Sequence, residues 1–168
     1  MRKAFAIAAG MTLALAIFAV QAMSQPKPAS AFDRLKVLVG TWTGKGAQGG
    51  ESTITIRLVS NGTAMEETFQ NSADNQMVTL YYPDGDRVGV THYCSSGNQP
   101  RMETKAMTGD QTEFDFAFDG ITNLASPDAG HMHHLVVKIA DNDHFSEQWT
   151  WRENGKDTVE SFQLTRKS

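Results

Sequence analysis

The sequence predicts an all-β fold, an antiparallel up-and-down β-barrel of about ten strands with a short N-terminal helix. Two observations carry this prediction. From Thr41 onward, apolar residues recur with a period of two, which is typical of strands with one buried face. Turn-forming residues interrupt these runs about every eight to twelve positions, as in successive hairpins. A meander of this length hides its two edge strands most simply by closing into a barrel.

The chain begins with the pattern of an export signal. Residues 1–3 carry two positive charges, and the stretch AFAIAAGMTLALAIFAV that follows is apolar and uncharged. No second apolar run follows to hold the chain in a bilayer. We therefore expect a signal peptide over 1–24, a linker over 25–30 and a barrel domain over 31–168. The mature protein is expected in the periplasm or outside the cell, without membrane association.

A short helix is predicted directly before the first strand, in the stretch AFDRLKVLVG. Phe32, Leu35 and Leu38 follow one another at helical spacing, and Gly40 ends the pattern. A stretch of this length forms one or two turns of helix. We expect this helix to lie at one mouth of the barrel.

Ten runs then alternate between apolar and polar residues, and short turns separate them. The predicted strands lie near 41–46, 51–59, 63–70, 75–82, 87–94, 100–107, 111–118, 131–140, 144–152 and 157–166. Most connections contain turn sequences such as Asn61–Gly62 or Asn154–Gly155. Only residues 119–130 predict a longer connection.

Alternation also predicts which side chains face the interior. Its clearest examples are the apolar sets Ile54, Ile56 and Leu58, and Phe114, Phe116 and Phe118. The same alternation places ionisable side chains on apolar faces: His92, His131, His133 and Glu147, with Glu67 and Glu160 as further candidates. His134 and His144 fall on the outer face. Buried ionisable groups are costly unless paired, so a cavity holding water, a ligand or an ion would account for them. Strand ends at a barrel mouth would also account for His131 and His133.

Three stretches resemble a known group of proteins. LVGTWTGKG resembles the start of calycin-like barrels, in which Gly-x-Trp on the first strand packs next to a short helix. THYCSSGNQPRM and HMHHLVVKIADNDHFSEQWTW resemble exported bacterial proteins with a lipocalin-like barrel and no assigned function. The strand count is similar to that of nitrobindin-like barrels. The resemblance covers about residues 31–167 and implies the fold and export, but no activity.

The first functional hypothesis is a barrel that binds a small, mainly apolar ligand. The expected ligand-binding residues are His92, His131, His133, Glu147, Trp149, Trp151 and Arg101. Indole rings and phenylalanines would line an apolar cavity, although aromatic residues also fill ordinary cores. Arg101 is placed to close the mouth or to bind a carboxylate, although an arginine in such a loop is also often simply solvated.

The second hypothesis is a metal-dependent hydrolase or lyase. Two histidines at positions i and i+2 of a strand point the same way, about 6.6 Å apart. His131 and His133 could therefore bind one zinc or iron ion, with His92 or Glu147 as the third ligand and Glu160 behind them. Haem is the less favoured cofactor. Nitrobindin-like proteins hold haem through a histidine near the C-terminal end, whereas the last histidine here, His144, is expected to face outward.

The charge balance argues against nucleic acid as a partner. The chain has 15 lysines and arginines against 19 aspartates and glutamates. Removal of Arg2 and Lys3 with the signal leaves 13 basic residues against 19 acidic residues, a net charge of −6. An acidic protein has no electrostatic attraction to phosphate backbones. Cys94 is the only cysteine, so the domain must be held by its core without an intrachain disulfide.

Overall fold

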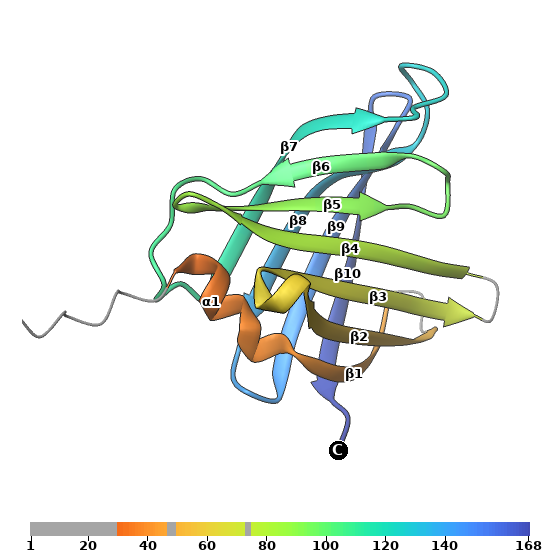
Figure 1. The fold of residues 1–168 in the computed structure, drawn as a ribbon. Helices are drawn as coiled ribbons and strands as arrows, with labels where there is room; N and C mark the ends of the chain where they lie inside the picture. Colours follow the sequence, from red (N-terminus) through yellow and green to blue (C-terminus); the bar gives the residue numbers. More distant parts are fainter. Residues whose placement is uncertain (1–29, 47–49, 73–74) are drawn as a thin grey trace, which may run out of the picture.

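The strands close into one antiparallel barrel, as the sequence predicts (Figure 1). A computed structural model of the protein describes residues 30–46, 50–72 and 75–168. The predicted signal peptide and all of the linker except Ser30 lie outside the described residues. Among the residues described, no helix is both long enough and apolar enough to span a bilayer.

Each strand pairs with its neighbours in sequence, and the first pairs with the last. The elements are α1 (Ala31–Leu35), the 3₁₀ turns η1 (Lys36–Leu38) and η2 (Ser60–Gly62), and the strands β1 (Gly40–Lys45), β2 (Glu51–Val59), β3 (Ala64–Ser72), β4 (Asn75–Asp84), β5 (Arg87–Tyr93), β6 (Gln99–Glu103), β7 (Glu113–Thr122), β8 (His131–Ile139), β9 (His144–Glu153) and β10 (Lys156–Arg166). Closure runs from Trp42 opposite Arg166 to Lys45 opposite Gln163. No edge of the sheet is left unpaired.

β6 and β7 differ from the expected boundaries. β6 ends early, at Glu103, whereas β7 continues to Thr122, so the long connection begins later than expected. The extension is possible because β7 carries a bulge: Arg101 lies opposite Gly120 while Met102 lies opposite Phe118. One extra residue in β7 lets its last part follow β6.

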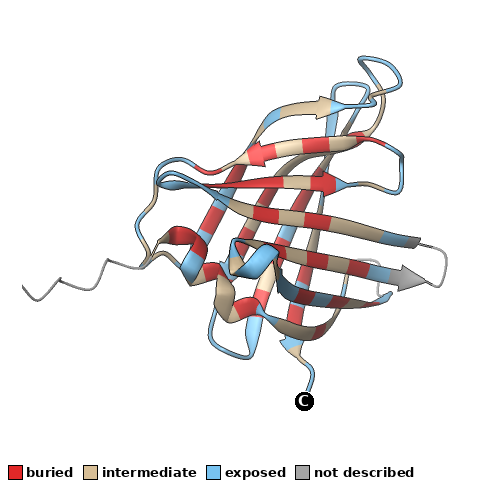
Figure 2. Ribbon diagram, in the orientation of Figure 1, coloured by how far each residue is buried: buried red, intermediate tan, exposed pale blue. Residues whose placement is uncertain are grey.

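The predicted inner faces are confirmed over most of the barrel, as the alternation of buried and exposed segments in Figure 2 shows. Ile54, Ile56, Phe114 and Phe116 are buried. Leu58 shares this face, opposite the buried Met65, but is itself 41% exposed. β1 begins at Gly40, opposite Ile56, so no β1 residue covers Leu58.

The helix closes one end of the barrel. Ser30 and Asp33 form a capping box that satisfies the first backbone N–H groups of α1. Ala31, Phe32 and Leu35 are buried against the core, and α1 contacts β4 and β5. We call this end the helix end. The opposite end, where β5 finishes and β8 begins, is the far end.

Trp42 and Arg166 fix the helix end to the closing strands. The indole N–H of Trp42 donates to the Leu38 carbonyl at 2.7 Å. The Arg166 guanidinium lies 4.0 Å from the centre of the Trp42 ring and donates to the carbonyls of Val37 and Val39, each at 2.8 Å. The connection between helix and barrel is therefore held from both β1 and β10.

Replacing Trp42 by phenylalanine should weaken this end. The variant leaves the Leu38 carbonyl without its donor and a gap beside Arg166. We expect the free energy of unfolding to fall by about 2 kcal/mol, measured by urea denaturation followed by far-ultraviolet circular dichroism. Val159→Ala, at an exposed position, should change it by less than about 0.5 kcal/mol. Equal losses in both variants would contradict the role given to Trp42.

Candidate functional site

Three polar side chains form a row across the inner face of one wall. Glu67 of β3 lies opposite Thr79 of β4, and Thr79 lies opposite His92 of β5. All three are buried, with no more than 3% of any residue exposed. The row exists because residues directly opposite on neighbouring strands share a face of the sheet.

The opposite wall supplies two further residues of the group, both from β9. The indole N–H of Trp149 donates to Glu147 Oε2 at 3.0 Å. The rings of His92 and Trp149 meet with their centres 4.8 Å apart. The carboxyl groups of Glu67 and Glu147 come within hydrogen-bonding reach of each other. Two contacts therefore cross the barrel from one wall to the other.

The two glutamates form a buried acid pair. Burial, and then the neighbouring charge of Glu147, raise the pKa of Glu67 well above its usual range; burial also raises the pKa of Glu147. The Tyr81 hydroxyl donates to Glu67 Oε2 at 2.9 Å, which offsets part of this effect. Because two buried carboxylates in contact repel each other when both are ionised, the pair favours holding a proton between them. We call Glu67, Thr79, Tyr81, His92, Glu147 and Trp149 the interior polar cluster.

Two atoms of the interior polar cluster lack a partner. His92 Nδ1 is 2.9 Å from the Thr79 hydroxyl, but His92 Nε2 has no hydrogen-bond partner among the described residues. Glu147 Oε1 likewise has no hydrogen-bond partner among the described residues. Buried polar atoms are nearly always satisfied, so a free imidazole nitrogen inside a barrel needs an explanation. Burial lowers the pKa of His92 to about 4, and the ring is therefore neutral near pH 7.

This burial should make stability depend on pH. The pKa of His92 falls from 6.5 in the unfolded chain to about 4 in the fold, so unfolding takes up a proton between these values. As the pH falls from 7 to 4, we expect the wild-type protein to lose about 3 kcal/mol of unfolding free energy relative to a His92→Gln variant. Urea denaturation at each pH unit measures this difference. His144→Gln, on the outer surface, should follow the wild type; a pH-independent difference for His92→Gln would contradict the assignment.

The interior becomes less buried towards the far end. At the helix end Leu35, Trp42 and Phe114 are fully buried, whereas the inner-face residues Met77 and Trp151 near the far end are half-buried. Glu160 is also half-buried and lies opposite Trp149 on β10. The interior polar cluster thus separates a packed half of the barrel from a less packed half lined by aromatic and acidic residues.

His131 and His133 lie at the far end, where β8 carries a bulge. His134 lies opposite Thr150 and Met132 opposite Trp151, which leaves His133 as the extra residue. The alternation that groups His131 and His133 with Leu135 does not hold through this bulge. Met132 takes the place opposite Trp151, and His131 lies opposite Arg152 instead. The sequence does not reveal the bulge.

The two imidazoles form a chain of hydrogen bonds with Arg152. Arg152 Nη1 lies 2.6 Å from His133 Nε2, and His133 Nδ1 lies 3.2 Å from His131 Nε2. His131 Nδ1 lies 3.0 Å from the Ala129 carbonyl. An arginine only donates and a carbonyl only accepts, so every proton position is determined. Both histidines are neutral and carry their proton on Nδ1. Burial and the Arg152 charge lower the pKa of His133, which agrees with this state.

His131 and His133 lie close together, but neither His92 nor Glu147 joins them as a third metal ligand. His92 contacts Thr79 and Trp149, and all four ring nitrogens of His131 and His133 are already used. A cation bound there would also lie beside Arg152, which Asp157 holds through two hydrogen bonds. Among the described residues, no three histidine, cysteine, aspartate or glutamate side chains form a group that could hold a metal ion. The metal hypothesis would need this hydrogen-bonded chain to be broken.

The proton positions at the far end can be tested directly. Two-bond ¹H–¹⁵N correlation spectra at pH 7 should show both His131 and His133 as neutral rings protonated on Nδ1. Arg152→Met removes the donor, so His133 should gain a population protonated on Nε2. Arg87→Met, which breaks an ion pair with Glu103 elsewhere, should leave both spectra unchanged. A wild-type His133 protonated mainly on Nε2 would contradict the chain.

The other expected site residues have different places. Arg101 lies on the outer face, between Thr91 and Gly120, and its guanidinium occupies the space where a Cβ at Gly120 would lie. It does not reach the interior. Trp151 packs directly on Gly130, where any Cβ would collide with the indole. His144 is exposed and bonded to Asp141, as its predicted outward position requires, so it offers no axial ligand to a haem in the barrel.

Thr79 and Tyr81 are functional candidates that the sequence analysis missed. Both lie on β4, in the stretch MVTLYY, with Met77 on the same face. Alternation through this stretch would have placed the hydroxyl groups inside. The signal is weak because Val78 and Leu80 on the opposite face are also apolar.

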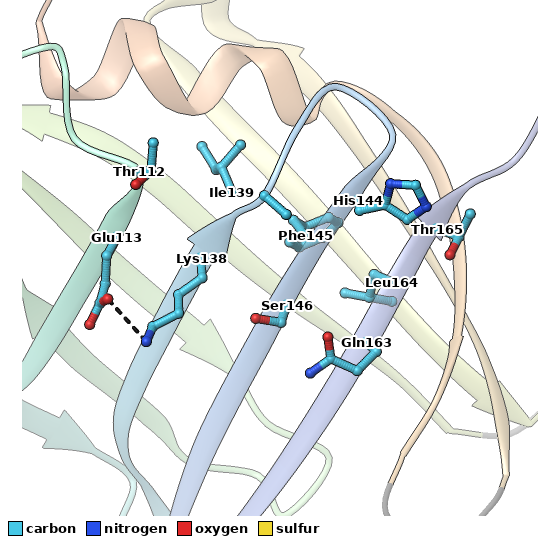
Figure 3. Close-up of a pocket in the computed structure, with 11 residues that line it drawn as sticks. Thr112, Glu113, Lys138, Ile139, His144, Phe145, Ser146, Gln163, Leu164 and Thr165 are labelled. Atoms are coloured by element: carbon cyan, nitrogen blue, oxygen red, sulfur yellow. Dashed lines mark ion pairs between the residues drawn. The ribbon is translucent and has the colours of Figure 1, made fainter.

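A separate hollow of about 390 Å³ lies beside the β8–β9 turn (Figure 3). Its lining includes Lys138, His144, Ser146 and Gln163, and Glu113 forms an ion pair with Lys138 at 3.0 Å. These polar groups are accessible to water or already paired. The hollow contains no buried unpartnered group, and we assign it no role.

Comparisons with known proteins support the fold. No protein-family model matches the chain, and no curated protein matches it. Among solved structures it is similar to a protein of unknown function from the DUF3598 family of Nostoc punctiforme, with a TM-score of 0.55 and 10% identity. The match covers 86% of this chain and 53% of the other, so this chain spans about half of that protein's length. Such a likeness shows a shared barrel fold. The narrower resemblance to exported lipocalin-like proteins remains a prediction.

Proposed function

We propose that the protein is an exported barrel that binds a small, mainly apolar molecule inside, next to the interior polar cluster. The observation that carries this proposal is the free Nε2 of His92. His92 lies on the inner face of β5, so this nitrogen, at the tip of the ring, reaches into the barrel. A buried nitrogen without a partner is costly, and a ligand group that bonded to it would remove that cost.

The surroundings of His92 suit an apolar ligand body. Trp149 lies against the imidazole, and Phe69 and Phe162 form an edge-on pair with centres 5.4 Å apart. Both phenylalanines are buried, and Phe162 lies opposite Glu147 of the interior polar cluster. Burial of an apolar chain of several carbons between such rings would contribute most of the affinity, at about 0.8 kcal/mol per CH₂ group. The polar cluster would set the orientation of the ligand.

The far end supports a route into the barrel. Inner-face residues there are less buried than those that α1 covers. The proposed place of action is the periplasm or the exterior, which rests on the signal pattern of residues 1–24. The acidic balance of the chain argues against nucleic acid as an alternative partner.

The proposal is tested with N-phenyl-1-naphthylamine, a neutral dye whose fluorescence rises in apolar surroundings. We expect saturable binding by the wild-type protein and displacement by 1-octanol, whose hydroxyl can bond to His92. His92→Leu should weaken 1-octanol binding by about tenfold, because the polar anchor is lost. The matched outer-surface variant His144→Leu should bind as the wild type does.

Absence of saturable dye binding would refute the proposal. Equal weakening in both variants would show that the dye and 1-octanol bind outside the barrel. Native mass spectrometry of the protein as purified adds an independent measurement, because a co-purified small molecule would appear as a mass increase.

A further inference from the structure

We infer that the molecule bound in the interior carries a positively charged ammonium group, which lies at Glu67 and Glu147. This inference rests on the proposed function and names the chemical class of its ligand. Four observations lead to it: the charges on the inner face, the hydrogen-bonding groups left free there, the lack of a cation beside the acid pair, and the aromatic rings around it.

The first observation concerns charge. In the described part of the barrel, inner-face positions between the ends of the strands hold three glutamates, Glu67, Glu147 and Glu160, and no lysine or arginine. Arg166 follows the same alternation but lies at the helix end, bound to Trp42 and backbone carbonyls. Lys156 is exposed at the β9–β10 turn. An anionic ligand would meet only repulsion inside, whereas a cation would be attracted.

The second observation concerns hydrogen bonding. Arranged with its proton on Nδ1, donating to the Thr79 hydroxyl, His92 presents Nε2 as an acceptor. Glu147 Oε1 is also an acceptor, since it receives no N–H among the described residues. In this tautomer of His92, which the contact with Thr79 allows, the free groups of the cluster are acceptors. An ammonium offers three donors and no acceptor, which matches this set.

The third observation is that the acid pair has no cationic partner. Neither Glu67 nor Glu147 takes part in an ion pair among the described residues. His92 is neutral and cannot supply the missing charge. In the empty protein a shared proton limits the repulsion between the carboxyls. An ammonium would replace that proton and leave both carboxylates ionised, each beside an opposite charge.

The fourth observation is the aromatic lining. Trp149 lies in contact with His92 and bonds to Glu147, and Tyr81 bonds to Glu67 while packing edge-on against Phe116 at 5.9 Å. Aromatic rings next to a desolvated cation add to its binding. The half-buried Glu160, opposite Trp149, lies on the far-end side of the pair and would favour entry of a cation.

Three probes of equal chain length test the inference: n-octylammonium, 1-octanol and octanoate, each used to displace N-phenyl-1-naphthylamine at pH 7. We expect n-octylammonium to bind at least about tenfold more tightly than 1-octanol, and octanoate to bind most weakly. Glu147→Gln, which keeps the shape of the side chain, should reduce the ratio of n-octylammonium affinity to 1-octanol affinity to about one. Glu113→Gln, on the outer surface, should preserve the preference.

Proton release provides a second readout. If the ammonium displaces the shared proton, its affinity should rise with pH, by up to about tenfold per unit, while 1-octanol affinity stays level. Calorimetry in two buffers of different ionisation enthalpy measures the released proton. Glu67→Gln should abolish the release and serves as the second variant if Glu147→Gln does not fold.

The outcomes separate the two proposals. Binding of 1-octanol as tightly as n-octylammonium would overturn the ammonium assignment and leave the proposed function standing. A preference for n-octylammonium that is independent of pH and survives Glu147→Gln would also overturn it, because the cation would then bind away from the acid pair. Failure of all three probes, together with failure of the dye to bind, would refute the proposed function itself.

Discussion

The contact between Glu67 and Glu147 constrains the rest of the interior. Two acidic side chains from opposite walls meet in the barrel, and the described residues place no lysine or arginine beside them. The fold accommodates them with donors: a tyrosine hydroxyl for one, an indole N–H for the other, and a proton between them. Each donor comes from the strand position that alternation already turns inward. The polar cluster is therefore a consequence of barrel geometry.

The interior differs in burial and in polar contacts between the two ends of the barrel. At the helix end, α1, Trp42 and Arg166 produce an interior without free polar atoms, which favours stability. Beyond the polar cluster the inner residues are less buried, and within the cluster His92 Nε2 has no hydrogen-bond partner among the described residues. Loosely packed, partly satisfied interiors are unfavourable unless something occupies them. The two halves of the described interior therefore differ in how closely their side chains are packed.

The fold was predictable from the sequence because a period of two and the turn residues are local signals. His92, Glu147 and Trp149 were predictable for the same reason, since β5 and β9 keep their alternation without interruption. His131 and His133 were not. A bulge adds one residue to β8, and nothing in the sequence HMHH indicates which residue will lack a partner on β9. The contact between Arg152 and His133 follows from that bulge as well. The hydrogen-bonded chain at the far end could therefore not be predicted from the sequence.

The pairing of β1 with β10 has a consequence for the time course of folding. The two strands lie more than a hundred positions apart, and Arg166 reaches back to the carbonyls beside the helix. A chain that is synthesised from its N-terminus cannot complete the sheet until β10 has been made. Pairings between strands this far apart in sequence also form slowly. During that interval the sheet is open, and the strands at its two edges lack the partners that the finished barrel supplies.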